Sequence, residues 1–191
     1  MINLNDESFD KVGGSIFNGG VAGIVENVTV TLEKKKPEDK DGSPDYKVIF
    51  TDSSGASCNT PFWYVKEATQ YKTVDQQVLT QGKVLKHLIH TLHDPAYVFP
   101  SFETPEALLN GCMKIIRDSL NPALKFRIFA NYGSTSSVKT FLQPRSWVPF
   151  VESQTVPISE TRLKVGNLDQ MVQIKEDAPE TTSAATADDW E

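Results

Sequence analysis

The feature that most constrains the fold is the spacing of apolar residues, which changes along the chain from every second position to helical spacing and back. In residues 24–33, apolar residues such as Val28, Val30 and Leu32 alternate with polar ones. Alternation with many β-branched side chains is typical of a half-buried strand. Residues 1–20 are polar and glycine-rich, and we expect them to form an irregular lead-in.

Two further strands are predicted after a charged loop. Residues 46–50 alternate again, and the turn residues at 52–55 favour a tight hairpin into a strand over 56–65. Pro61 lies inside this third strand and indicates an edge or a bulge. The strand ends in the aromatic run Phe62-Trp63-Tyr64.

Helical spacing begins at a capping box formed by Thr73 and Gln76. A second start is marked by Thr104, a cap residue, followed by proline. The two apolar faces comprise Val78, Leu85, Leu88, Ile89 and Leu92, then Leu108, Leu109, Cys112, Met113, Ile115 and Ile116. Residues 125–130 return to a strand pattern, and a last strand is expected near 147–151.

This order of elements favours a mainly β fold with inserted helices. Three strands, helices and two strands is the order of an OB-fold, a five-stranded Greek-key barrel, and other small barrels and α+β sheets share it. We therefore expect an OB-fold-like domain over 21–175, in which residues 152–175 have no clear pattern. The second helix would be an elaboration of the simple fold.

Negative charge is concentrated at the end of the chain. Six of the 25 acidic residues lie within 176–191, which contains no lysine or arginine. Residues 1–175 then hold 19 acidic and 19 basic residues, so the body is neutral although the whole chain carries −6. A negative net charge therefore does not exclude a nucleic-acid partner for the body. Few apolar anchors occur in 176–191, and we expect a disordered acidic tail.

Basic and aromatic residues fall on the strands and loops with which an OB-fold binds single strands, by stacking bases on rings and pairing phosphates with cations. Any one of these aromatic residues could instead belong to the core, and the lysine run could be a solvated loop. The candidate DNA-binding residues are Lys34, Lys35, Lys36, Lys47, Trp63, Tyr64, Arg127, Phe129, Tyr132, Lys139, Arg145 and Trp147.

The tail ends in Asp188, Asp189, Trp190 and Glu191. One aromatic ring among negative charges suits docking to a basic pocket, on a partner protein or on the chain itself, where it would compete with DNA. A tail that only adds solubility is the alternative.

Other classes of site find little support. His87, His90 and His93 lack the partner spacing of a zinc site, so a surface histidine stripe is expected and no metal or cofactor. No phosphate-binding glycine loop and no nucleophile elbow occurs, which favours a protein that is not an enzyme. Two cysteines and the absence of a signal peptide or an apolar run predict a soluble cytoplasmic protein with no membrane partner.

With these features the chain resembles the bacteriophage-type single-stranded DNA-binding proteins, which combine an OB-fold with an acidic C-terminal tail ending in an aromatic residue. Here Glu191 follows Trp190, so the ring is penultimate. The resemblance implies coating of transient single strands in replication, recombination or repair, in the host cytoplasm if the protein is viral. It also implies recruitment of replication proteins by the tail. A homo-oligomer is compatible with this role.

Two other functions stay open at this point. A virion structural or assembly protein would use a β-barrel as a protein interface and would not bind DNA. A metal-dependent nuclease on an α+β core would need carboxylates that the pattern does not single out.

Overall fold

The computed structural model describes residues 16–132, 142–146, 148–164 and 171–172. The lead-in up to residue 15, the loop at 133–141, Trp147 and the tail at 176–191 lie outside the described residues. The helices and strands are a short 3-10 helix η1 (Phe17–Gly20), β1 (Gly23–Lys34), β2 (Tyr46–Thr51), β3 (Ser57–Phe62), α1 (Val74–Leu92), α2 (Pro105–Ser119), β4 (Phe126–Tyr132), β5 (Leu142–Pro144), β6 (Val151–Ser153) and a 3-10 turn η2 (Ile158–Glu160).

The strands form one antiparallel sheet in the order β3-β2-β1-β4-β5, with β6 also paired to β4. The long strand β1 changes partner halfway: its first half pairs with β4 and its second half with β2. The change falls at a bulge between Val25 and Val28, where Asn27 has a φ of 59°. Bulges bend a strand, and this one lets β1 serve both halves of the sheet.

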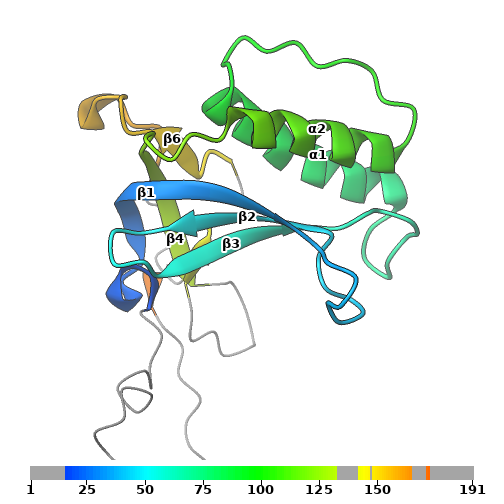
Figure 1. Cartoon of the computed structure of the whole chain (residues 1–191), viewed down its shortest axis with the longest axis horizontal. Coiled ribbons are helices and arrows are strands. Elements are labelled where there is room, and N and C mark those ends of the chain that lie inside the picture. The colour runs from blue at the N-terminus through cyan, green and yellow to red at the C-terminus, as the bar shows by residue number, and fades with distance from the viewer. Residues whose placement is uncertain (1–15, 133–141, 147, 165–170, 173–191) are drawn as a thin grey trace, which may run out of the picture.

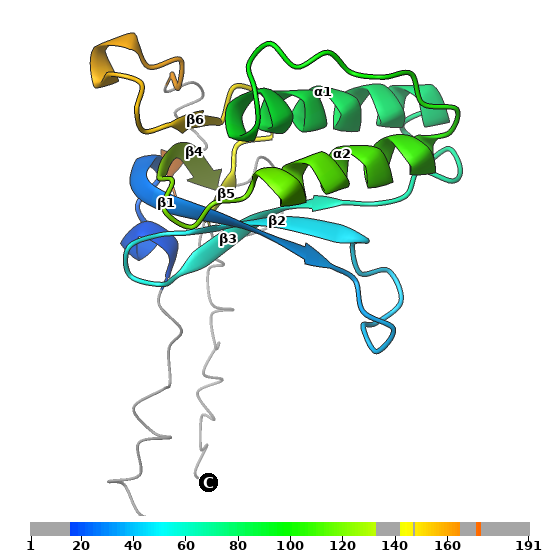
Figure 2. The ribbon, with the colours of Figure 1, turned by 45° about the horizontal axis from the view of Figure 1, so that its top comes forward.

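Helices α1 and α2 lie side by side over one face of the sheet (Figures 1 and 2). Both begin where the cap residues predicted, since the hydroxyls of Thr73 and Thr104 accept hydrogen bonds from the backbone N–H three residues on. Their apolar faces meet the inward residues of the strands, including Val48, Phe50 and Phe62, in one core. The mainly β fold with inserted helices is thus confirmed.

The sheet is open between its two end strands. Residues of β3 and β5 lie close together, yet among the described residues no hydrogen-bonded ladder joins them. Pro61 lies on β3 and Pro144 on β5, and proline has no backbone N–H to donate to a ladder. A hollow of about 190 Å³ lies along this seam.

The C-terminal part of the domain differs from the prediction. Residues 148–150 are not a strand, and the expected strand near 147–151 is replaced by the short strands β5 and β6. Arg127 of β4 donates to the Val156 carbonyl, and its cross-strand neighbour Glu152 accepts hydrogen bonds from Thr161 and Arg162. Residues of the segment 152–175, which had no clear pattern, therefore lie against β4. Every residue of β4 is buried. In the sequence, Arg127 and Phe129 suggested that one face of this strand is exposed. The structure buries both faces of β4, as in a strand that is covered on both sides.

A buried carboxylate fastens η1 to the hairpin between β2 and β3. Asp52 accepts hydrogen bonds from the backbone N–H groups of Asn18, Ser54 and Ala56, at 2.7, 2.8 and 3.1 Å, and from the Ser54 hydroxyl at 2.6 Å. Burial opposes ionisation, but these hydrogen bonds prevail and lower the pKa of Asp52 below its usual value. The hairpin turn is therefore held by an ionised side chain.

Within the described part of the chain, neither helix has the length and apolar character needed to span a lipid bilayer.

Candidate functional site

Among the described residues, the most exposed aromatic rings lie on the segment that links β3 to α1, residues 63–72, which we call the aromatic loop. Trp63 is 46% exposed and Tyr71 is 82% exposed. Phe62, just before the loop, points into the core, and strand alternation turns Trp63 the other way. Exposed rings of this size are uncommon unless they contact something, which makes the loop the first candidate for a binding surface.

The aromatic loop lines an open groove of about 660 Å³ against the first turns of α1. Lys66 and Lys72 line the same groove, and Glu67 is its one acidic residue among the described residues. Tyr71, Lys66 and Lys72 were missed in the sequence, because they lie in a polar stretch with no strand or helix pattern. The available signal was Tyr71 itself, a large ring between polar residues directly before a helix cap.

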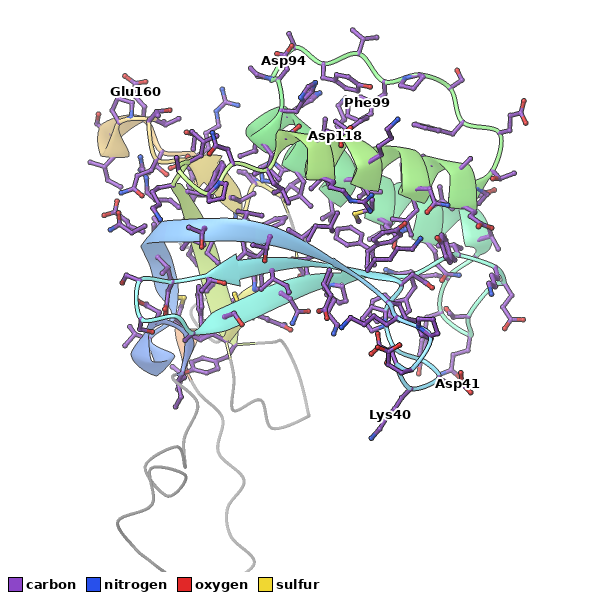
Figure 3. The ribbon with its side chains drawn as sticks, in the orientation of Figure 1. Lys40, Asp41, Asp94, Phe99, Asp118 and Glu160 are labelled. Atoms are coloured by element: carbon purple, nitrogen blue, oxygen red, sulfur yellow. The ribbon has the colours of Figure 1, made fainter. Side chains whose placement is uncertain are left out.

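A second loop, residues 35–45 between β1 and β2, adjoins the first; we call it the lysine loop. It extends past the sheet on the side away from the helices, with Lys40 and Asp41 at its tip (Figure 3). The two loops are tied together, because the Trp63 indole donates a hydrogen bond to the Gly42 carbonyl at 3.4 Å and the Tyr64 backbone N–H donates to Asp45 at 2.7 Å. Both loops therefore belong to one surface.

Three of the candidate lysines converge beside Tyr64. Lys34, Lys35 and Lys36 line a hollow of about 360 Å³ together with this ring and three aspartates, Asp39, Asp41 and Asp45. The Asp39 carboxylate caps the backbone at Lys36, at 2.7 Å, and Asp45 holds Tyr64, so two of the acids have structural tasks.

Tyr64 lies partly inside the molecule. Its phenol donates a hydrogen bond to Asn110 on α2 at 2.8 Å, and its ring meets Tyr46 edge-on. Burial raises the pKa of the Tyr64 phenol, which keeps it neutral. Tyr64 thus offers one edge to the surface while its hydroxyl fixes the end of the sheet to the helices.

Lys47 lies on the sheet face that points away from the helices. Its cross-strand neighbours are Glu33 on β1 and Pro61 on β3. The Lys47 ammonium lies 3.5 Å from the Glu33 carboxylate, and both side chains are partly exposed. An exposed pair of this kind contributes little to stability, so Lys47 can exchange its partner for a phosphate.

Four of the candidate residues lie inside the protein. Arg127 is only 2% exposed, with its Nη1 atom 3.1 Å from the Glu152 carboxylate and its Nη2 donating to the Val156 carbonyl. The Arg145 guanidinium lies over the Phe129 ring, 4.7 Å from the centroid, and the Tyr132 hydroxyl donates to the Gly20 carbonyl. Their buried positions separate Arg127, Phe129, Tyr132 and Arg145 from the exposed surface.

The remaining candidates, Lys139 and Trp147 together with Asp188, Asp189, Trp190 and Glu191 of the tail, lie outside the described residues.

The three histidines do not form the expected surface stripe. The Nε2 atom of His87 accepts hydrogen bonds from the backbone N–H groups of Phe150 and Val151, at 3.2 and 3.3 Å. Burial lowers the pKa of His87 to about 4, so the ring is neutral. His90 contacts the Tyr97 carbonyl, and His93 contacts the Ser119 hydroxyl. Each ring therefore joins α1 to a neighbouring segment, and no cluster of three or more potential metal ligands occurs in the described part of the chain.

The aromatic loop, the lysine loop and Lys47 together place aromatic rings beside lysine side chains, a chemistry suited to a flexible polyanion with exposed bases. Comparison with protein families, curated proteins and solved structures finds no match for this chain, so the functional argument depends on these residues.

Proposed function

We propose that this chain is a non-enzymatic single-stranded DNA-binding protein that coats transient single strands in DNA replication, recombination or repair. The observation that carries the proposal is the exposed pair Trp63 and Tyr71, with lysines on the same and the adjoining loop. Aromatic rings stack on any base, and cations follow the phosphates, so such a surface binds single strands with little sequence preference.

The order of the strands supports an OB-fold-like reading of the sheet. β1 lies between β2 and β4, β3 and β5 are the end strands, and the helices follow β3. OB-folds bind oligonucleotides on the face of strands 2 and 3 and on the loops that join strands 1–2 and 4–5. In that reading, Lys47 would lie on the face of strands 2 and 3, and the lysine loop would join strands 1 and 2. Lys139 belongs to the segment that joins β4 to β5.

We propose further that the acidic tail competes with DNA for this surface and recruits replication proteins once DNA has displaced it. The support is its chemistry, six acidic residues and Trp190 in 176–191 against a body of equal positive and negative charge. Deleting 176–191 should raise the affinity for single strands at low salt. Unchanged affinity at low salt would count against competition by the tail.

Fluorescence anisotropy with a labelled oligothymidylate, at about 50 and 200 mM salt, tests the binding function directly. We expect salt-sensitive binding to the single strand and little binding to the duplex. Trp63→Ala should weaken binding by about 5- to 150-fold, because stacking on one base is worth roughly 1–3 kcal/mol. No detectable binding of the intact chain at low salt would refute the proposal and favour a structural or assembly role.

A matched pair of triple variants separates phosphate contacts from general charge. Replacing Lys34, Lys35 and Lys36 with glutamine should weaken binding and make the slope of log K against log[salt] less negative by up to about 2, since each neutralised phosphate on a single strand contributes roughly 0.7. The control replaces three exposed lysines of the helices, Lys83, Lys86 and Lys114. Equal effects of the two triples would show that net charge, and not the lysine loop, governs binding.

A further inference from the structure

We propose that two glutamines of α1, Gln77 and Gln81, are positioning residues that hold the aromatic loop in the conformation that presents Trp63 and Tyr71 to the nucleic acid. This inference rests on the proposed function and names residues that do not themselves need to contact the DNA.

Gln81 pairs with both backbone polar groups of Trp63, its N–H and its carbonyl. Its Oε1 atom accepts a hydrogen bond from the Trp63 N–H at 3.3 Å, and its Nε2 atom donates to the Trp63 carbonyl at 3.2 Å. The side-chain amide thus pairs with one residue as a neighbouring strand would, just past the end of β3. This double contact restricts the direction in which the indole ring leaves the backbone.

Gln77 holds the far end of the same loop. Its Nε2 atom donates to the Glu67 carbonyl at 2.9 Å and to the Lys72 carbonyl at 3.3 Å. Between these points, the Thr69 hydroxyl accepts from the backbone N–H of Lys72 at 3.1 Å and closes the turn that carries Tyr71. Gln77 therefore determines where that turn lies relative to α1.

The spacing of the two glutamines explains how one helix reaches both ends of the loop. Residues four positions apart lie on the same side of a helix, and both glutamines line the groove beneath the aromatic loop. Further along the same side, α1 packs into the core through Leu85, Leu88 and Ile89. The glutamines are therefore attached to a rigid support.

Hydrogen bonds matter here because Tyr64 is the one side chain of the aromatic loop that packs against the core. Every residue from 63 to 72 is exposed or half-buried. Loops with few buried apolar contacts open at low cost in free energy. Fixing such a loop before binding reduces the entropy lost when the DNA arrives, which raises affinity without adding a contact.

The test uses Gln81→Met, which keeps the side-chain length and removes both hydrogen bonds, and Leu79→Met as a control at an exposed position of α1 outside the groove. Affinity of the full chain for labelled oligothymidylate should fall about tenfold for Gln81→Met and remain unchanged for the control. The melting temperature should stay within a few degrees of the wild-type value, since the lost hydrogen bonds are exposed.

A double-mutant cycle distinguishes positioning from an unrelated effect. In a Trp63→Ala background, Gln81→Met should weaken binding much less, because the ring that it positions is gone. An equal loss in both backgrounds would overturn the assignment of Gln81 as a positioning residue for Trp63.

A readout without nucleic acid keeps this inference distinct from the proposed function. Replacing Trp147 and Trp190 by phenylalanine leaves Trp63 as the sole tryptophan of the chain. In that background, Gln81→Met should increase quenching of Trp63 by acrylamide. Unchanged quenching would refute the positioning of Trp63 by Gln81. If quenching rises but the intact chain binds no oligonucleotide, Gln81 does position Trp63. The proposed function, and with it the role of this positioning in DNA binding, would then be refuted.

Discussion

Arg127 offers the sharpest separation between a structural and a nucleic-acid-binding role. The Arg127→Met variant keeps most of the apolar stem and removes the guanidinium of a residue that is 2% exposed. The change leaves the Glu152 carboxylate, also nearly buried, without the cation that lies 3.1 Å away. Removing one member of a buried pair costs about 3–5 kcal/mol, because the other charge stays desolvated.

The contacts that survive place the cost at the lower end of this range. Glu152 still accepts hydrogen bonds from the Thr161 hydroxyl at 2.6 Å and the Arg162 backbone N–H at 3.2 Å. Glu26, 3.7 Å from the Arg127 Nε atom, is half exposed and can be solvated. We therefore expect a loss of about 3 kcal/mol in the free energy of unfolding. A domain of this size would then melt roughly 6–12 °C lower.

Urea unfolding followed by circular dichroism measures this loss, and anisotropy measures oligonucleotide affinity of the folded variant. The double variant Arg127→Met with Glu152→Leu should recover much of the stability, since no unpaired buried charge remains. Lys47→Met is the control, because its exposed ion pair with Glu33 should be worth less than about 1 kcal/mol. Full stability of Arg127→Met combined with lost oligonucleotide binding would refute the reasoning and make Arg127 a DNA contact.

Three further predictions follow from buried titratable groups. Between pH 6.5 and 4, His87 binds a proton in the unfolded chain but not in the folded one. The free energy of unfolding should therefore fall by about 2 kcal/mol from pH 7 to pH 5. Urea unfolding of His87→Gln should show a smaller decline, and an equal decline would contradict this role. Asp52 has a lowered pKa, so its contribution is present above pH 3.8 and is lost as pH falls through the folded value. Asp52→Asn should therefore cost about 1–3 kcal/mol at pH 7 and flatten the acid limb of the stability curve. Burial raises the pKa of Cys112 to about 11 and that of Cys58 further, so both thiols should resist a disulfide reagent until urea is added, and rapid native reaction would contradict their burial.

The first three strands and both helices could be predicted because their local patterns and their environments agree. Alternation in β2 follows from one face on the core and one facing outward, and the helix starts follow from the hydroxyls of Thr73 and Thr104. In the same way, alternation across Phe62 and Trp63 separates a core ring from an exposed one. Where one residue's environment is set by its immediate neighbours, the pattern is sufficient.

β4 and the residues after it could not be predicted in this way. Arg127 on β4 donates to the Val156 carbonyl, 29 residues further along the chain and in a segment without a periodicity of its own. Arg127 therefore looks like a surface cation in the sequence, although it pairs with Glu152 in the interior. The predicted surface stripe of histidines was wrong for the same reason, because their partners, such as the backbone at Phe150, come from other segments.

The prolines at the two ends of the sheet also affect how many copies can crowd together. In the proposed function, copies on one strand of DNA would be held at high local concentration, where unpaired strand edges of neighbouring molecules would add to one another and grow into fibrils. Pro61 on β3 and Pro144 on the three-residue strand β5 interrupt both edges. The same prolines that lie along the seam of one molecule thus oppose edge-to-edge pairing between molecules.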